Sequence, residues 1–148
     1  MNKKVCIKIS GLHGVEAMGD GECIEVINIG SYYKRNGKHY VRYEELSENG
    51  DTLAGNLIKI TQNEVEIIAR GTGDRGTHMV FTNGQKNMSY YSTPYGGMNM
   101  GVETYDLNVS EEKDVIRVDI HYGLEINLDY VTDCRVHIII ESVNETIE

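Results

Sequence analysis

The stretch Gln85–Val109, QKNMSYYSTPYGGMNMGVETYDLNV, lies near the middle of the chain and decides how the remainder is interpreted. It contains the only proline of the protein, Pro94, and the glycine pair Gly96 and Gly97. Proline has no backbone N–H and belongs at the end of a strand or in a turn. The stretch is therefore predicted to form a strand, a sharp turn and a second strand, which indicates an all-β chain.

The apolar residues of the second strand in this stretch change parity. Before Glu103 they occupy even positions, and after Thr104 they occupy odd positions. Because side chains alternate between the two faces of a strand, one extra residue must be accommodated at the change. This predicts a β-bulge near Glu103 and Thr104.

The rest of the chain consists of short strand-like runs separated by turn-forming pairs such as Asn36-Gly37 and Asn83-Gly84. The run Val115–Tyr130 keeps its apolar residues on even positions throughout, so we expect one long strand bent at Gly123, or else a hairpin at that glycine. A turn is expected at 131–133. Strands are predicted at 3–10, 22–30, 39–46, 52–61, 64–70, 78–82, 86–93, 98–109, 115–130 and 134–142.

About ten antiparallel strands in one chain curl readily into a closed barrel, which removes exposed strand edges. The 148 residues are enough for one domain with a real core. We expect a single all-β domain over residues 1–148, an antiparallel β-barrel of eight to ten strands. It would carry a glycine-rich loop at 11–21 and a frayed tail at 143–148. The apolar residues of 22–30 occupy both parities, so the sequence does not decide which face of this strand points inward.

Charge and composition exclude several classes of function. Fourteen Lys and Arg oppose 23 Asp and Glu, which gives a net charge of −9. Such a surface repels phosphate backbones, so we expect no nucleic acid partner. No apolar run is long enough for a signal peptide or a membrane span, so no membrane partner is expected either. Three cysteines without a CxxC pair fit a reduced cytoplasmic protein.

Metal and thiol chemistry are not favoured by the sequence. The five histidines lack metal-ligand spacing, and His121 and His137 fall on the polar parity of their strands. His39 is the only histidine expected to face inward. Cys6 and Cys134 lie among aliphatic residues, where cysteine behaves as a small hydrophobe. We therefore expect no metal and no cofactor.

Tyrosines are the clearest sign of a binding site. A tyrosine has a large apolar ring and a polar tip, so a pocket lined by several suits a small amphipathic ligand. The same residues also pack the interiors of small barrels, so a barrel filled by its own side chains is the alternative. The tyrosines that could supply such a lining are Tyr43, Tyr90, Tyr91, Tyr95, Tyr105, Tyr122 and Tyr130.

Two glutamates near the end of the third predicted strand are candidates for acid–base chemistry. Glu44 and Glu45 are adjacent, so they point to opposite faces and cannot form a catalytic carboxylate pair. Glu45 shares a face with Tyr43, and if that face is the lumen, it needs a partner or water. Arg70 is the candidate partner, and a solvated pair at the rim is the alternative.

The segments GKHYVRYEE, NLIKI, VEIIARG, MVFTNGQ and YYSTPYG, in this order, resemble the YwiB-like family of small bacterial barrel proteins. The resemblance runs from the first strand to Ile140. It implies a lipocalin-like (calycin) barrel of eight to ten antiparallel strands and no particular activity. The chain has no tryptophan, so the Gly-x-Trp signature of true lipocalins is missing. Ligand transport is then an analogy from fold, and fold does not determine function.

Our leading hypothesis is a non-enzymatic protein that binds a small amphipathic molecule in the barrel or at its mouth. The alternative is a structural or interaction module with a filled barrel, acting through its outer surface as a homodimer. An enzyme using Glu45 and Arg70 as an acid–base site ranks third. The side chains expected to contact the ligand are Tyr43, Glu45, Arg70, Tyr91, Thr93 and Tyr95.

Overall fold

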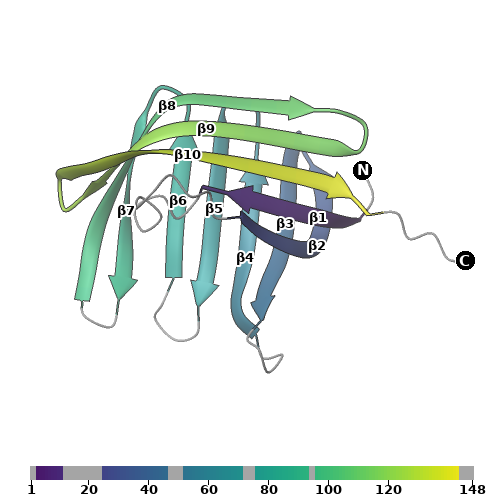
Figure 1. Cartoon of the computed structure of the whole chain (residues 1–148), viewed down its shortest axis with the longest axis horizontal. Helices are drawn as coiled ribbons and strands as arrows, with labels where there is room; N and C mark the ends of the chain where they lie inside the picture. The colour runs from purple at the N-terminus through teal and green to yellow at the C-terminus, as the bar shows by residue number, and fades with distance from the viewer. Residues whose placement is uncertain (1–2, 12–24, 47–51, 72–75, 94–95, 144–148) are drawn as a thin grey trace, which may run out of the picture.

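The computed structural model describes residues 3–11, 25–46, 52–71, 76–93 and 96–143, with only the backbone at some strand ends. It contains ten strands (Figure 1), each close to a predicted run. In the described part of the chain, no helix is long and apolar enough to cross a membrane. The strands are β1 (Lys4–Ser10), β2 (Glu25–Arg35), β3 (Lys38–Leu46), β4 (Thr52–Ile60), β5 (Glu64–Gly71), β6 (Gly76–Thr82), β7 (Lys86–Thr93), β8 (Gly96–Glu111), β9 (Val115–Ile126) and β10 (Asp129–Ser142).

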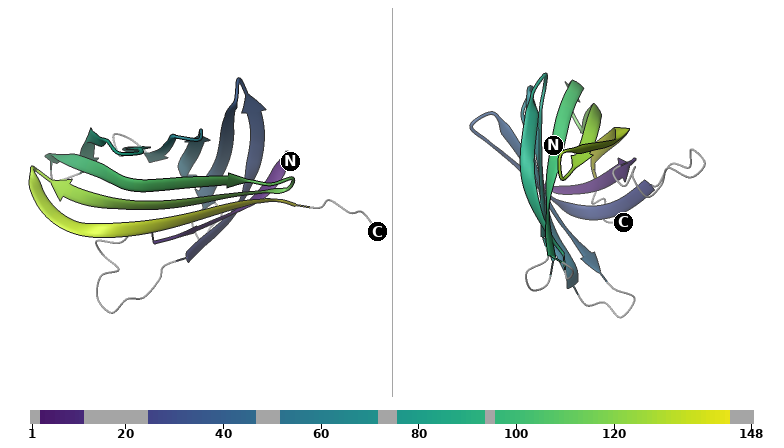
Figure 2. Two further views of the ribbon diagram at one scale, coloured as in Figure 1. Left: turned by 90° about the horizontal axis from the view of Figure 1, so that it is seen from above. Right: turned by 90° about the vertical axis from the view of Figure 1, so that its left-hand side faces the viewer.

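Every strand pairs antiparallel with its sequence neighbours, and β1 also pairs with β10 (Figure 2), so the sheet curls into a single nearly closed barrel. This confirms the predicted fold. The seam between β6 and β7 is thin, because these strands pair at one described position, Gly76 with Ser92. Toward the other end of these two strands, the side-chain amide of Asn87 donates to the Val80 carbonyl (3.2 Å) and to Thr82 Oγ1 (3.0 Å). A side chain thus supplies hydrogen bonds that the backbone ladder lacks.

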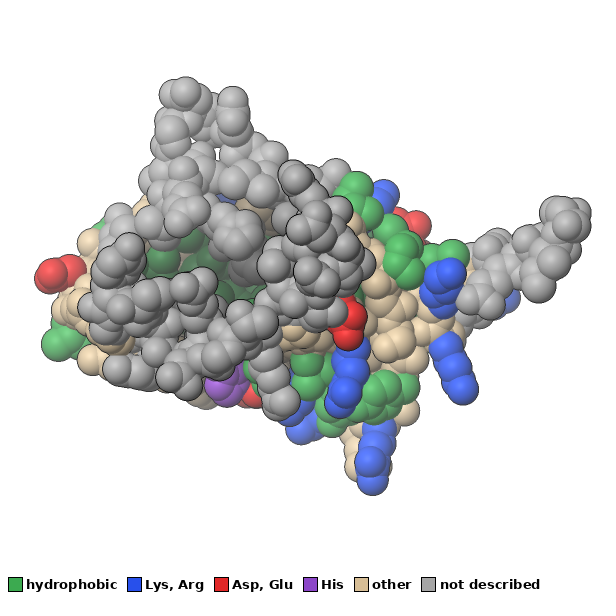
Figure 3. All heavy atoms as spheres, turned by 90° about the horizontal axis from the view of Figure 1, so that it is seen from below, with side chains coloured by type: hydrophobic (Ala, Val, Ile, Leu, Met, Phe, Trp, Pro, Cys, Tyr) green, Lys and Arg blue, Asp and Glu red, His purple; other side chains and the backbone are tan. Residues whose placement is uncertain are grey.

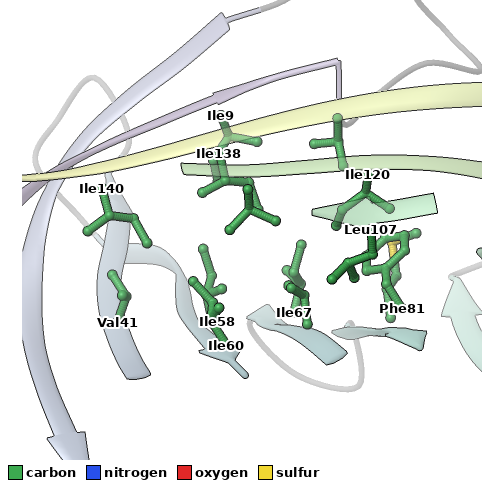
Figure 4. Packing of buried hydrophobic residues seen from close by; sticks show 14 of the residues in the cluster. Ile9, Val41, Ile58, Ile60, Ile67, Phe81, Leu107, Ile120, Ile138 and Ile140 are labelled. Atoms are coloured by element: carbon green, nitrogen blue, oxygen red, sulfur yellow. The ribbon is translucent and has the colours of Figure 1, made fainter. Parts of the chain in front are cut away.

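The barrel interior is packed with aliphatic and aromatic side chains from the inward positions of the strands. Figure 4 shows residues such as Ile58, Phe81 and Ile138 directed toward one another, and each of these is fully buried. Phe81 meets Tyr122 edge to face at 4.9 Å between ring centroids. Burying a side chain of this size contributes about 1.5–3 kcal/mol. The alternation along the strands therefore supplies the main driving force for closure.

The predicted bulge is confirmed, since the register between β8 and β9 shifts between Thr104 and Asp106. Met100 and Val102 face inward before the shift, and Leu107 does so after it. On β2 the even positions face inward, so the apolar Ile27 and Ile29 lie outside and are 57% and 54% exposed.

The predicted end of the long strand was wrong. β9 does pass through Gly123 without a break, which excludes a hairpin there, but it ends at Ile126. The turn lies at Asn127 and Leu128, both with positive φ, and not at 131–133. Asparagine tolerates this conformation, and here Asn127 exchanges hydrogen bonds with the backbone of Asn99. Leu128 has the parity of the core yet is 74% exposed, so parity alone misplaced the turn.

The glycine-rich loop at 11–21 lies outside the described residues apart from Gly11, and the tail at 143–148 does so apart from Val143. The amide of Val143 donates to the Lys4 carbonyl at 2.9 Å, so the chain is still tied to β1 at this point.

Burial of Tyr122 makes the stability of the barrel depend on alkaline pH. Its hydroxyl contacts Cys134, and desolvation first, then Cys134, raises the tyrosine pKa well above the ordinary 10.0. The unfolded chain releases this proton near pH 10 while the folded chain retains it, so stability is full below pH 10 and falls above it. One such group contributes a slope of about 1.4 kcal/mol per pH unit. We expect Tyr122→Phe to flatten the fall, measured by urea unfolding between pH 9 and 11. An unchanged slope would contradict the assignment.

Candidate functional site

The strand β2 changes partners halfway along its length. From Gly30 to Arg35 it pairs with β3, but the residues before Gly30 pair with β1 alone. Beyond Tyr43, β3 pairs with β4 alone. The two strands therefore part, as Figure 1 shows, with β2 running beside β1 while β3 continues toward the lower end. We call this place the fork and define it as residues 29–31 of β2 and 42–44 of β3.

Gly30 makes the fork possible. A Cβ atom at this position would overlap the carbonyl oxygen of Arg42 and lie 2.8 Å from Cδ1 of Ile7. Only glycine lets β1, β2 and β3 approach so closely where β2 turns from one partner to the other.

A hollow of about 620 Å³ lies at the fork. Its apolar lining comes from Ile29, Leu57 and Ile68, on outward positions of β2, β4 and β5. Gly55 also lines it, and a Cβ atom there would meet no heavy atom within 4 Å. The missing side chain therefore adds to the open volume. Pockets for small ligands usually measure about 300–1,000 Å³, so this hollow is large enough.

The polar side chains that line the hollow include Arg42, Glu44 and Asn56. Arg42 lines the hollow, is exposed, and forms no hydrogen bond or ion pair within the described residues. Asn56 is 8% exposed, and its side-chain nitrogen has no hydrogen-bond partner. The side-chain nitrogen of Asn28, two residues before Gly30 on the inward parity, is also buried without a partner. An unpaired buried amide costs about 1–3 kcal/mol, so a ligand that accepts these hydrogen bonds would recover free energy.

Of the predicted contact residues, Tyr43 lines the hollow and is 6% exposed. For Glu45, Arg70, Tyr91 and Thr93 the structure describes the backbone alone, and Tyr95 lies outside the described residues. The contacts of these five side chains therefore stay a prediction.

The strand register nevertheless brings these chain positions to one end of the barrel. Glu45 lies opposite Ala54, which lies opposite Gly71. Arg70 lies opposite Gly76, which pairs with Ser92. Figure 3 views this end from below, and hydrophobic side chains of the interior are visible through it.

The opposite end of the barrel contains a hydrogen-bonded chain that sequence reasoning missed. His39 is 3% exposed, which confirms its inward orientation. Its Nδ1 lies 2.7 Å from the Tyr32 hydroxyl and its Nε2 lies 3.1 Å from Glu111 Oε1. Desolvation and the charge of Glu111 raise the pKa of Tyr32. Both ring nitrogens of the buried His39 thus have hydrogen-bond partners.

Glu111 could not be assigned this role from the sequence. It ends β8 beside Glu112 and carries no pattern that links it to His39, which lies 72 residues earlier. The inward parity of His39 was the available signal, because a buried histidine needs polar partners. The prediction that His137 lies on the polar face of its strand is confirmed, since His137 is exposed and contacts Asp119 on the outer face.

The ten antiparallel strands, the absence of any described helix and the apolar interior define a small all-β barrel protein. Residues 7–138 match the family described as Domain of unknown function (DUF1934), and the chain belongs to that family.

A solved structure with the same fold is the ywiB protein from Bacillus subtilis. It is 18% identical, with a TM-score of 0.73 over 96% of this chain and 93% of that chain. The resemblance predicted from the sequence is thus confirmed, while the relation to lipocalins stays a prediction. No curated protein matches the chain.

The packing at the fork predicts opposite effects for two glycine substitutions. Gly30→Ala should lower the free energy of unfolding by about 2–3 kcal/mol, because the new methyl group overlaps backbone atoms. Gly55→Ala should raise it by up to about 1 kcal/mol, because the methyl group meets nothing and the unfolded chain loses freedom. Urea denaturation of both variants measures this difference. Equal effects would contradict the close approach at Gly30.

The hydrogen bonds among Tyr32, His39 and Glu111 predict that removing the Tyr32 hydroxyl lowers the stability of the protein. Tyr32→Phe leaves Nδ1 of the buried His39 without a partner and should destabilise the protein by about 1–3 kcal/mol. Tyr33→Phe is the matched control, since Tyr33 is 43% exposed and its ring stacks on Tyr40 with or without the hydroxyl. Thermal unfolding of the two variants compares them, and a Tyr32→Phe variant as stable as the control would show that the hydrogen bond contributes nothing.

Proposed function

We propose that the protein is a non-enzymatic binder of a small amphipathic molecule, held in the hollow at the fork. The observation that carries the proposal is the exposed guanidinium of Arg42, which has no partner within the described residues and lies beside the apolar lining of Ile29, Leu57 and Ile68. The Glu44 carboxylate also lines the hollow. A guanidinium binds carboxylate and phosphate groups through two parallel hydrogen bonds. An apolar body with an anionic head therefore matches the lining.

Two further features support a ligand at this place. Asn56 lines the hollow, and its buried side-chain nitrogen is a donor that the protein leaves unused. Tyr43, which is 6% exposed, also lines the hollow. The fork opens the barrel wall between β2 and β3, so a ligand can enter from the side without unfolding any strand.

A second candidate function is an interaction module that acts as a homodimer through its outer surface. It is favoured by the filled interior and by large apolar residues exposed on β7 to β10, such as Met88 (51%), Leu128 (74%) and Tyr130 (61%). Single exposed apolar residues are common on proteins, so this candidate ranks below the hollow.

The test is native mass spectrometry of protein purified gently from its own host. We expect an additional mass of small-molecule size that is lost on denaturation. Gly55→Leu should abolish it, because the leucine fills the hollow where no atom stands in its way. Arg42→Gln should weaken it about tenfold, since a charged hydrogen bond contributes about 1.5 kcal/mol or more.

Ser110→Leu is the matched control, because Ser110 is an exposed residue of β8 far from the fork in the strand order. It should retain the additional mass. A bare monomer from the wild-type chain, or a Gly55→Leu variant that keeps the mass, would contradict the proposal. A bare mass of dimer size would favour the interaction module.

A further inference from the structure

A second hollow, of about 430 Å³, lies farther along β2 and shares no lining residue with the hollow at the fork. Three of the residues that line it are lysines from parts of the chain far apart in sequence. Lys3 precedes β1, Lys34 lies near the end of β2, and Lys113 lies between β8 and β9. We call it the lysine hollow; its lining residues are Lys3, Tyr32, Tyr33, Lys34, Glu111 and Lys113.

The charge of the lysine hollow is opposite to that of the protein. The chain as a whole carries −9, whereas here three ammonium groups face one carboxylate. The neighbouring Glu112 does not offset this charge, because Arg117 pairs with it at 3.3 Å.

The lysines have spare capacity for an anion. Lys3 and Lys113 form no side-chain hydrogen bond or ion pair within the described residues. Lys34 Nζ contacts Glu111 Oε2 at a long 3.4 Å. An ammonium group has three donors, so this single contact leaves two of them unused.

Both carboxylate oxygens of Glu111 have partners at this hollow. One of its oxygens accepts from the buried His39, whose ring is held in turn by Tyr32, and the other faces Lys34. The carboxylate is therefore held in place by the barrel interior and positions Lys34 at the hollow. Tyr33 also lines the hollow, while its ring stacks on Tyr40 at 4.8 Å between centroids.

We propose that the lysine hollow binds the phosphate group of a small organic phosphate. Lysine binds phosphate as a point charge, and three lysines around a hollow of this size match a dianion better than a monoanion. Long nucleic acids are disfavoured, because their many phosphates would meet the acidic remainder of the surface.

The experiment is isothermal titration of the full chain with inorganic pyrophosphate at low ionic strength. Lys34→Gln and Lys113→Gln should each weaken binding about tenfold, as expected for loss of a charged hydrogen bond. Lys38→Gln is the matched control. It removes the same charge from the same β2–β3 hairpin, but Lys38 does not line the hollow, so affinity should change less than twofold.

Glu111→Gln removes the one carboxylate among the residues that line the hollow and should change affinity in the opposite direction. Its amide oxygen can still accept from His39, while loss of the negative charge should tighten pyrophosphate binding several-fold. Gly55→Leu at the fork should leave pyrophosphate binding unchanged, so the two hollows are tested independently.

The proposal is overturned if pyrophosphate gives no saturable heat at millimolar concentration. It is also overturned if Lys38→Gln weakens binding as much as Lys113→Gln, because only an adventitious ion interaction would then remain. Circular dichroism confirms that each variant is folded before titration. All of the substituted lysines are exposed, so folding should be unaffected.

Discussion

The hydrogen bonds of β1 are the constraint on which the rest of this structure depends. A curled sheet must pair its first and last strands, since an unpaired edge exposes backbone donors and acceptors. The seven residues of β1 do this by pairing with β10 on one side and β2 on the other. To follow β1, however, β2 must leave β3 at Gly30, and the fork results. Closure at one place thus produces an opening at another.

Two neighbouring regions of the barrel bury polar groups in two ways. In one, Tyr32, His39 and Glu111 are joined by hydrogen bonds that connect β2 and β3 to β8. At the hollow of the fork, the buried side-chain nitrogen of Asn56 has no partner. The first arrangement stabilises the empty protein, whereas the second leaves a cost that binding can recover. The unpaired donor therefore favours the fork as the place of the proposed ligand.

Electrostatics separates the two hollows further. The hollow at the fork is lined by one arginine and one glutamate beside apolar side chains, so its charges balance. The lysine hollow is lined by three cations and one carboxylate, which suits a doubly charged group. Because the chain as a whole carries −9, the lysine hollow is a local excess of positive charge on an acidic protein.

The sequence by itself determined the strands, the bulge near Thr104 and the barrel class, because alternation with period two reports which face of each strand is buried. It also placed His39 inward and singled out Tyr43. Tertiary structure alone decided the turn at Asn127, which depends on hydrogen bonds to Asn99 from another strand. It alone decided the pairing of His39 with Glu111, the convergence of the three lysines and the fork itself. Each of these joins residues far apart in the chain, and alternation along a strand carries no information about which distant strand lies opposite.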